Sequence, residues 1–184
     1  MEQFGDYAYY YNAFYKDKDY AKEASDVDTL LKKYGHDVKD VLVYGCGTGS
    51  HDAELVKLGY HLHGIDMSPQ MIEEARKRAA AQNLVIDYDV ADIRTYEPHR
   101  KYDAVVSLFH VMSYQTRNED IKNALTSARK ALNKGGILLF DCWYGPGVLT
   151  DPPAVRIKEV EDDDYRLIRL CKPELFDKRD AVDV

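Results

Sequence analysis

Three alternating glycines form the segment of this sequence whose spacing most clearly points to chemistry. They lie in the loop Gly45-Cys46-Gly47-Thr48-Gly49, between the apolar run 41–44 and an expected helix. Glycines let a backbone approach a ligand closely, and the first turn of the following helix offers free N–H groups. An ordinary strand-to-helix turn needs fewer glycines, so the sequence predicts a cofactor-binding loop.

The glycine spacing also distinguishes between two classes of cofactor. A dinucleotide-binding loop has the pattern G-x-G-x-x-G, whose last glycine lets the helix and the strand pack closely. Here the pattern is G-x-G-x-G, and Ser50 stands where that last glycine would fall. The loop therefore disfavours NAD and favours a cofactor that has no pyrophosphate.

Two carboxylates follow later strands of the expected sheet. Asp66 comes directly after the apolar run 61–65, where it could accept both hydrogen bonds of a ribose diol. It could instead cap the next helix, but Ser68 and Pro69 already provide the start of that helix. Asp92 follows the third strand, where it could hold an adenine amino group, although a solvated turn explains it equally well.

The apolar pattern places these loops in an α/β fold. Short apolar runs predict strands at 41–44, 61–65, 84–88, 102–109 and 137–140. Apolar residues that recur every three or four positions predict helices over 16–34, over 51–58, from 69 onward and around 121–132. Glycine stops are expected at Gly35 and at Gly135-Gly136, and residues 93–101 are expected to form a loop. This alternation predicts a doubly wound, mostly parallel, Rossmann-like sheet with helices on both faces.

The character of the sequence changes after Gly145. Prolines mark a break, and two expected strands, 154–157 and 165–170, flank an acidic turn at 161–164. The chain thus divides into an N-terminal aromatic lid and helix (1–36), a Rossmann-like core (37–145) and an antiparallel appendage (146–184). The last strands that would complete the main sheet are not found, so we expect either a fragment or a chain that ends short. A fragment would expose the edge of the fifth strand and could dimerise.

Composition limits the class of partner. The net charge of −7 argues against nucleic acid, because phosphate binding needs a clustered basic face. The three cysteines are widely spaced and the six histidines are scattered, which predicts neither a disulfide framework nor a metal site. No signal peptide or membrane-spanning run is visible. These features favour a cytoplasmic protein with no membrane partner.

Five segments in this order resemble the motifs of class I S-adenosylmethionine (SAM)-dependent methyltransferases. They are VLVYGCGTGSH, GIDMSPQMIEEARKR, DVADI, YDAVVSLFHVMSY and LNKGGILLFD. The resemblance covers residues 37–141 and implies SAM as the cofactor, with the glycine loop and Asp66 in the roles given above. It implies that Asp92 lies in the adenine-binding motif. It also implies cofactor contacts from four apolar residues, Met67, Met71, Ile93 and Leu108.

A closer resemblance, to the nucleotide-sugar N,N-dimethyltransferases, extends over most of the chain. It rests on KDKDYAKEASDVDTLL, CGTGSH, AVVSLFHVMSY and the aromatic pair Trp143-Tyr144. In those enzymes, which methylate the amino group of dTDP-amino-dideoxy sugars, an N-terminal aromatic segment closes over the active site. Tyr11 and Tyr15 occupy the matching stretch, which implies a lid contact to cofactor or acceptor from Tyr11. Tyr20 starts the helix, as either a cofactor contact or a core aromatic.

The same resemblance implies acceptor contacts from three further residues. Tyr114 falls where the sugar enzymes carry a His or Tyr beside the acceptor amine, and Asp141 falls where they have an acidic residue. His110 is a second candidate, or simply a partly exposed loop histidine. In-line methyl transfer from a sulfonium depends mostly on alignment, and an amine must first lose a proton to water or to a tyrosine or histidine base.

These observations together predict a SAM-dependent methyltransferase that acts on a small-molecule amine, such as a nucleotide-linked amino sugar. An O-methyltransferase and a non-catalytic SAM-binding domain remain as alternatives. The sequence disfavours a macromolecular acceptor, because no Asn/Asp-Pro-Pro-Tyr motif follows the fourth strand.

Overall fold

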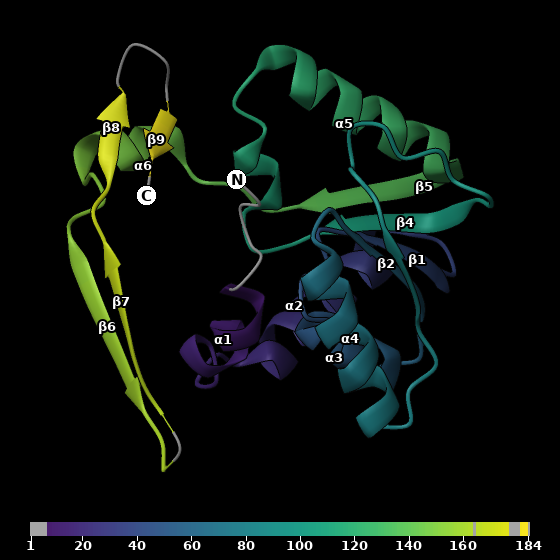
Figure 1. Ribbon diagram of the computed structural model, residues 1–184. Coiled ribbons are helices and arrows are strands. Elements are labelled where there is room, and N and C mark those ends of the chain that lie inside the picture. Colours follow the sequence, from purple (N-terminus) through teal and green to yellow (C-terminus); the bar gives the residue numbers. More distant parts are fainter. Residues whose placement is uncertain (1–6, 164, 177–180, 184) are drawn as a thin grey trace.

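The computed structural model describes residues 7–163, 165–176 and 181–183. Its centre is a five-stranded parallel sheet (Figure 1). In spatial order the strands are β3 (Asp87–Val90), β2 (His61–Asp66), β1 (Asp40–Tyr44), β4 (Tyr102–Ser107) and β5 (Leu132–Phe140). The order reverses between β1 and β4, so the ligand crevice of such a sheet is expected at the carboxyl ends of these two strands.

Helices cover both faces of the sheet. One face carries α2 (Tyr20–Tyr34), α3 (Ser50–Lys57) and α4 (Pro69–Ala81), and the other carries α5 (Asn118–Ala131). Alternate residues of β1 enter the two cores: Val41 and Val43 pack on the α2–α4 side, and Leu42 and Tyr44 pack on the α5 side. A strand that is buried on both faces is apolar along its buried length, which explains the continuous apolar sequence from Val41 to Tyr44.

The remaining elements flank this core. They are α1 (Tyr7–Phe14), the 3₁₀ helix η1 (Val111–Tyr114), α6 (Gly145–Thr150), and the strands β6 (Arg156–Glu161), β7 (Arg166–Cys171), β8 (Glu174–Phe176) and β9 (Ala181–Asp183). The β6–β7 hairpin extends away from the sheet, and α1 lies between the hairpin and α4 (Figure 1). The ammonium group of Lys158 on β6 donates a hydrogen bond to the carbonyl of Phe14 and joins the hairpin to α1.

The sequence signals at two helix ends are confirmed. Ser68 accepts the N–H of Met71 through its hydroxyl at 3.3 Å, and Pro69 is the first helical residue of α4, as in a capped helix start. The N–H of Gly35 donates to the carbonyl of Leu31 at 2.8 Å and ends α2. The predicted parallel sheet and antiparallel appendage are also confirmed.

Other element boundaries differ from the prediction. The helix expected from residue 16 begins at Tyr20, because the Asp19 carboxylate accepts the N–H of Lys22 at 2.8 Å and caps it. The segment before this cap forms the separate helix α1, which was not predicted. The third strand lies at Asp87–Val90 rather than at 84–88.

The expectation that Gly135 and Gly136 precede the fifth strand is wrong, because both lie within β5. The pairing of β4 with β5 shifts register between Tyr102 and Ala104, so the glycine segment forms an irregularity in the ladder. Gly135 has a φ of 85°, and a Cβ on Gly136 would lie 2.9 Å from the carbonyl oxygen of Asp103. Glycine is therefore required at both positions by the bulged strand.

Some expectations fall on positions that the structure does not describe. Residues 1–6 of the expected lid, Asp164 of the acidic turn and Val184 lie outside the described residues. Within the described ranges, no helix is both long enough and apolar enough to cross a membrane.

Candidate functional site

The glycine loop lies at the carboxyl end of β1 and leads into α3. Gly45, Gly47 and Gly49 have φ values of 65°, 55° and 71°, in the left-handed region that favours glycine. A Cβ on Gly45 or Gly49 would also collide with Val111 or Tyr88, respectively. A Cβ on Gly47 would meet nothing within 4 Å. The loop backbone at Gly47 therefore borders open space and is accessible to a ligand.

The two residues between the glycines have buried side chains. Burial raises the pKa of the Cys46 thiol well above its usual value, so the thiol remains a neutral packing group. Thr48 is also buried, and its hydroxyl donates to the side-chain carbonyl of Asn12 at 2.7 Å. We therefore expect cofactor contacts from Cys46 and Thr48 to come from their backbone.

Asn12 links helix α1 to the glycine loop through Arg78 of α4. The guanidinium of Arg78 donates to the Asn12 carbonyl oxygen at 2.7 Å and to the backbone carbonyl of Thr48 at 2.8 Å. This network holds α1 beside the glycine loop. Sequence reasoning missed Asn12 and Arg78, because an amide among tyrosines and an arginine on a polar helix face usually belong to the solvated surface.

Asp66 ends β2 and lies against the glycine loop, as predicted from its position after the strand. One carboxylate oxygen accepts the N–H of Gly47 at 3.0 Å, and the other accepts the N–H of Ser68 at 2.9 Å. Burial raises the pKa of Asp66, while these N–H groups act to lower it. Each oxygen can accept one more hydrogen bond, so the carboxylate can still bind the two hydroxyls of a diol.

The four apolar residues assigned to the cofactor differ in exposure. Met67 follows Asp66 and is 57% exposed, whereas Met71 and Ile93 are buried. Leu108 is partly buried against the core on the α2–α4 side. Among these four residues, only Met67 is more than half exposed.

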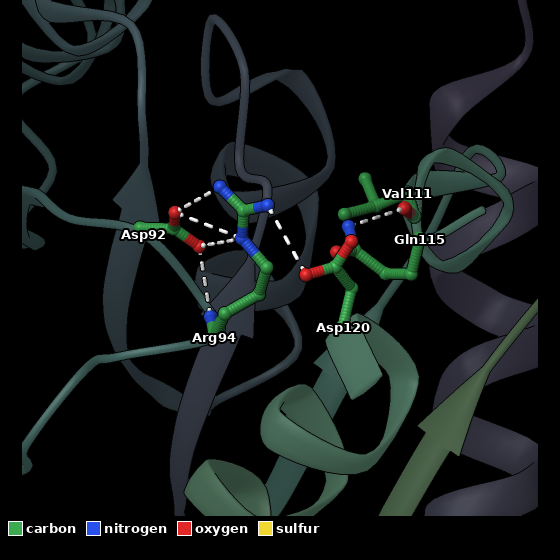
Figure 2. A network of polar contacts seen from close by, with 5 residues as sticks. All are labelled: Asp92, Arg94, Val111, Gln115 and Asp120. Carbon is green, nitrogen blue, oxygen red and sulfur yellow. Dashed lines mark hydrogen bonds and ion pairs between the residues drawn. The ribbon is translucent and has the colours of Figure 1, made fainter. Parts of the chain in front are cut away.

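Asp92 is engaged by a neighbouring arginine (Figure 2). Its carboxylate accepts hydrogen bonds from the backbone and guanidinium of Arg94, the guanidinium bonds being 2.5–2.9 Å long. The same guanidinium reaches Asp120 on α5 at 3.5 Å. Arg94 lowers the pKa of Asp92. An adenine amino group would thus meet a carboxylate that is already neutralised by an ion pair.

A second buried carboxyl lies beneath the loop and was not singled out from the sequence. Asp52, in the first turn of α3, is fully buried, and neither of its carboxylate oxygens has a well-directed hydrogen-bond partner. The Tyr88 hydroxyl lies beside it but is also without a well-directed bond. Burial raises the pKa of Asp52 to about 7. The sequence signal that could have identified Asp52 is the presence of an acidic residue in a helix that has to cover the sheet.

The predicted aromatic residues lie in two places. Tyr11 and Tyr15 have ring centroids 4.7 Å apart, and Tyr15 meets the ring of Phe109 edge-on at 5.1 Å. These tyrosines therefore extend from α1 to the turn after β4. Tyr20 instead meets the ring of His51 on α3 at 4.8 Å, so it packs between α2 and α3.

The predicted acceptor residues lie on the segments that follow β4 and β5. His110 and Tyr114 lie on the segment after β4, and Tyr114 is 58% exposed. Partial burial of the Tyr114 hydroxyl, together with the nearby Tyr15 and Asp66, raises its pKa. Asp141 follows β5, and its carboxylate accepts the backbone N–H groups of Phe109 and His110. The carboxylate is thus directed at the backbone of the β4 turn.

The two histidines on β2, His61 and His63, contact neighbouring tyrosine and aspartate side chains. His63 uses one ring nitrogen with the Tyr102 hydroxyl at 2.5 Å and the other with Asp89 at 2.9 Å. His61 is the first residue of β2, at the end of the strand away from Asp66, and its Nδ1 lies 3.7 Å from a carboxylate oxygen of Asp40. Among the described residues, no group of three or more His, Cys, Asp or Glu side chains could hold a metal ion.

Comparison with known proteins identifies relatives that share this core. Residues 41–136 match a family profile described as a methyltransferase domain. The chain is 32% identical over 148 residues to the dTDP-3-amino-3,4,6-trideoxy-alpha-D-glucopyranose N,N-dimethyltransferase of Streptomyces venezuelae. This match covers 79% of this chain and 61% of that enzyme. It is 25% identical to the dTDP-3-amino-3,6-dideoxy-alpha-D-glucopyranose N,N-dimethyltransferase of Streptomyces fradiae, over 71% of this chain and 50% of that enzyme.

Two solved structures share the fold over most of the chain. Streptomyces venezuelae DesVI superposes with a TM-score of 0.77 and 29% identity, over 91% of this chain and 70% of that chain. The sugar N-methyltransferase KedS8 from a Streptoalloteichus species superposes with a TM-score of 0.79 and 27% identity, over 90% of this chain and 66% of that chain. The chain spans 61% of the length of the first curated relative. Since the matching profile covers more than half of its residues, the chain belongs to the methyltransferase domain family.

Proposed function

We propose that this chain binds S-adenosylmethionine at the glycine loop and transfers its methyl group to the amine of a small molecule. One observation carries the proposal: the carboxylate of Asp66 holds the N–H of Gly47, the loop residue whose backbone borders open space. The glycine loop follows β1, one of the two strands between which strand order reverses, and such sheets bind ligands at that point. SAM is the cofactor that the fold and the family indicate.

The residues present fit this cofactor. Open space at Gly47 allows a ligand to contact the loop backbone, and Asp66 retains acceptor capacity for ribose hydroxyls. Met67 offers an exposed apolar side chain beside that carboxylate. The adenine contact assigned to Asp92 has weaker support, because Arg94 already occupies that carboxylate.

When bound, the cofactor supplies an electrophilic methyl group on a sulfonium. The residues of this chain then have to align an acceptor and remove its proton. The pKa of Tyr114 is raised, so Tyr114 stays protonated at neutral pH and cannot accept the proton. His110 can accept a proton through its imidazole, and water is the alternative acceptor.

We propose a nucleotide-linked amino sugar as the acceptor. The named activities of the relatives from Streptomyces venezuelae and Streptomyces fradiae support this choice. The test incubates the chain with SAM and three acceptors: a dTDP-amino sugar, its hydroxyl analogue and glycine. Mass spectrometry should show a gain of methyl groups on the amino sugar alone. Methylation of the hydroxyl analogue instead would contradict the proposed amine specificity.

Replacing Asp66 with alanine is expected to weaken SAM binding by about 1–3 kcal/mol, because the ribose would lose its charged acceptor. That loss corresponds to roughly a 5- to 150-fold increase in Kd by calorimetric titration. Asp87→Ala is the matched control, since Asp87 is an exposed carboxylate at the start of the neighbouring strand β3. Equal affinity for SAM in the Asp66→Ala and Asp87→Ala variants would show that Asp66 does not bind the cofactor.

A further inference from the structure

The turn that follows β4 contains two consecutive residues in a strained conformation. Phe109 and His110 both have a φ of 64°, in the left-handed region that a bulky residue such as phenylalanine rarely adopts. Such residues persist only where surrounding contacts hold them, and they cluster at functional sites. This turn lies at the carboxyl end of β4, beside the reversal of strand order.

A single carboxylate bonds the backbone of both residues. Asp141 accepts the N–H of Phe109 at 3.0 Å on one oxygen and the N–H of His110 at 2.7 Å on the other. The backbone N–H of Asp141 donates to the carbonyl of Ser107 at 3.2 Å, next to the last paired residues of β4 and β5. Hydrogen bonds to a carboxylate are stronger than those between neutral groups, so this pair offsets the strain of the turn.

The turn determines where two aromatic side chains lie. The ring of Phe109 meets the ring of Tyr15 edge-on. The ammonium group of Lys18 lies 3.9 Å from the centroid of the Phe109 ring. The imidazole of His110 lies 6.2 Å from the ring of Trp143. Its Nδ1 is 3.9 Å from the Asp141 carboxylate, too far for a hydrogen bond. If the turn relaxed, both side chains would leave these contacts.

We propose that Asp141 is a positioning residue, whose carboxylate holds the Phe109–His110 turn in its left-handed form and thereby places both side chains at the site. Phe109 and His110 then face the acceptor, while Asp141 acts on it only through them. The link to the acceptor rests on the proposed function, whereas the clamp on the turn can be tested without cofactor or acceptor.

The first test is amide hydrogen exchange of the whole chain, followed by NMR. An amide proton that is held in a hydrogen bond to a carboxylate exchanges more slowly than a free one. We expect the Phe109 and His110 amides to be protected in the unmodified chain and to lose protection in Asp141→Asn, whose side chain offers one acceptor oxygen instead of two. Asp103→Asn is the matched control, because Asp103 also accepts two backbone N–H groups, those of Lys39 and Asp40, at 3.1 and 3.0 Å.

Three outcomes are informative. Protection of the two amides that survives Asp103→Asn and is lost in Asp141→Asn supports the clamp. Phe109 and His110 amides that exchange as fast as free amides in the unmodified chain overturn it, and this result does not depend on the stability of any variant. Protection that is unchanged in Asp141→Asn overturns it as well, because another group would then hold the turn.

A kinetic measurement tests the functional part of the inference. Misplacement of side chains that orient an acceptor can lower kcat by roughly 100-fold. We therefore expect Asp141→Asn to reduce kcat by roughly 10- to 100-fold while the Kd for SAM stays unchanged. An unchanged kcat in Asp141→Asn would overturn the positioning role, whereas no SAM binding to the unmodified chain would instead overturn the proposed function.

Discussion

Replacing Asp52 with asparagine is expected to stabilise the protein by about 4 kcal/mol at pH 8 and to have little effect near pH 4. Burial raises the pKa of Asp52 to about 7 in the folded state, against a value near 3.9 in an unfolded chain. At a pH between these two values, the folded state therefore retains a proton that the unfolded state has lost. The charged carboxylate is fully buried at pH 8, and asparagine removes this cost.

The sign of this pH dependence follows from the direction of the shift. A raised pKa means that the folded protein binds the proton more tightly, so the contribution of Asp52 to stability falls as pH rises from about 4 to about 7. The charges that tune this group are the carboxylate of Asp66, which raises its pKa, and the guanidinium of Arg78, which lowers it. The Tyr88 hydroxyl beside it also lowers its pKa.

Urea unfolding at several pH values measures this effect directly. The difference in unfolding free energy between Asp52→Asn and the unmodified chain should grow with pH over this range. Asp87→Asn is the control, because it removes the same charge from an exposed position on β3. A difference for Asp52→Asn that does not change with pH would contradict the account of a buried, titrating carboxyl.

Replacing Gly47 with alanine is expected to weaken SAM binding by roughly 10- to 100-fold while costing only about 1–2 kcal/mol of stability. The stability cost arises because alanine must adopt a φ of 55°. The added methyl group would enter open space that we assign to the cofactor. A ligand in close contact with the loop backbone would be displaced by it.

Gly59→Ala provides a closely matched control for Gly47→Ala. Gly59 also has a positive φ, of 96°, and a Cβ there would also meet nothing within 4 Å. It lies in the turn after α3, at the end of the sheet away from the glycine loop. Calorimetric titration should show normal SAM affinity in Gly59→Ala, with a similar loss of stability by urea unfolding. Equal loss of affinity in both variants would mean that backbone strain, rather than contact with the ligand, causes the effect.

The sheet and the loops at its carboxyl edge could be predicted from the sequence because the signals are local. A strand that is buried on both faces is apolar along its buried length, as β1 is from Val41 to Tyr44. A serine followed by proline fixes a helix start, as at Ser68 and Pro69. The position of Asp66 follows from the same logic, since a residue that ends one parallel strand lies beside the loop that ends its neighbour.

The features that could not be predicted depend on contacts between distant parts of the chain. Asn12 and Thr48 are far apart in sequence, and nothing local indicates that they are hydrogen-bonded. The glycines of β5 resemble a helix stop, but the register shift against β4 is what requires them. Asp92 is an intermediate case, since Arg94 follows it by two residues and was a local indication of the ion pair.

The left-handed turn at Phe109 and His110 shows a related limit. Neither residue type indicates a positive φ with the strength that glycine does. The contact that holds the turn comes from Asp141, which follows a different strand. Sequence resemblance pointed to Asp141 as an acceptor contact, but gave no sign of its two hydrogen bonds to the backbone of this turn.

The most direct test of the central claim is calorimetric titration of the chain with SAM, with NAD as the comparison. The three left-handed glycines, the open space at Gly47 and the Asp66 carboxylate beside it predict saturable binding of one SAM per chain and no binding of NAD. Binding of NAD without binding of SAM would contradict the account.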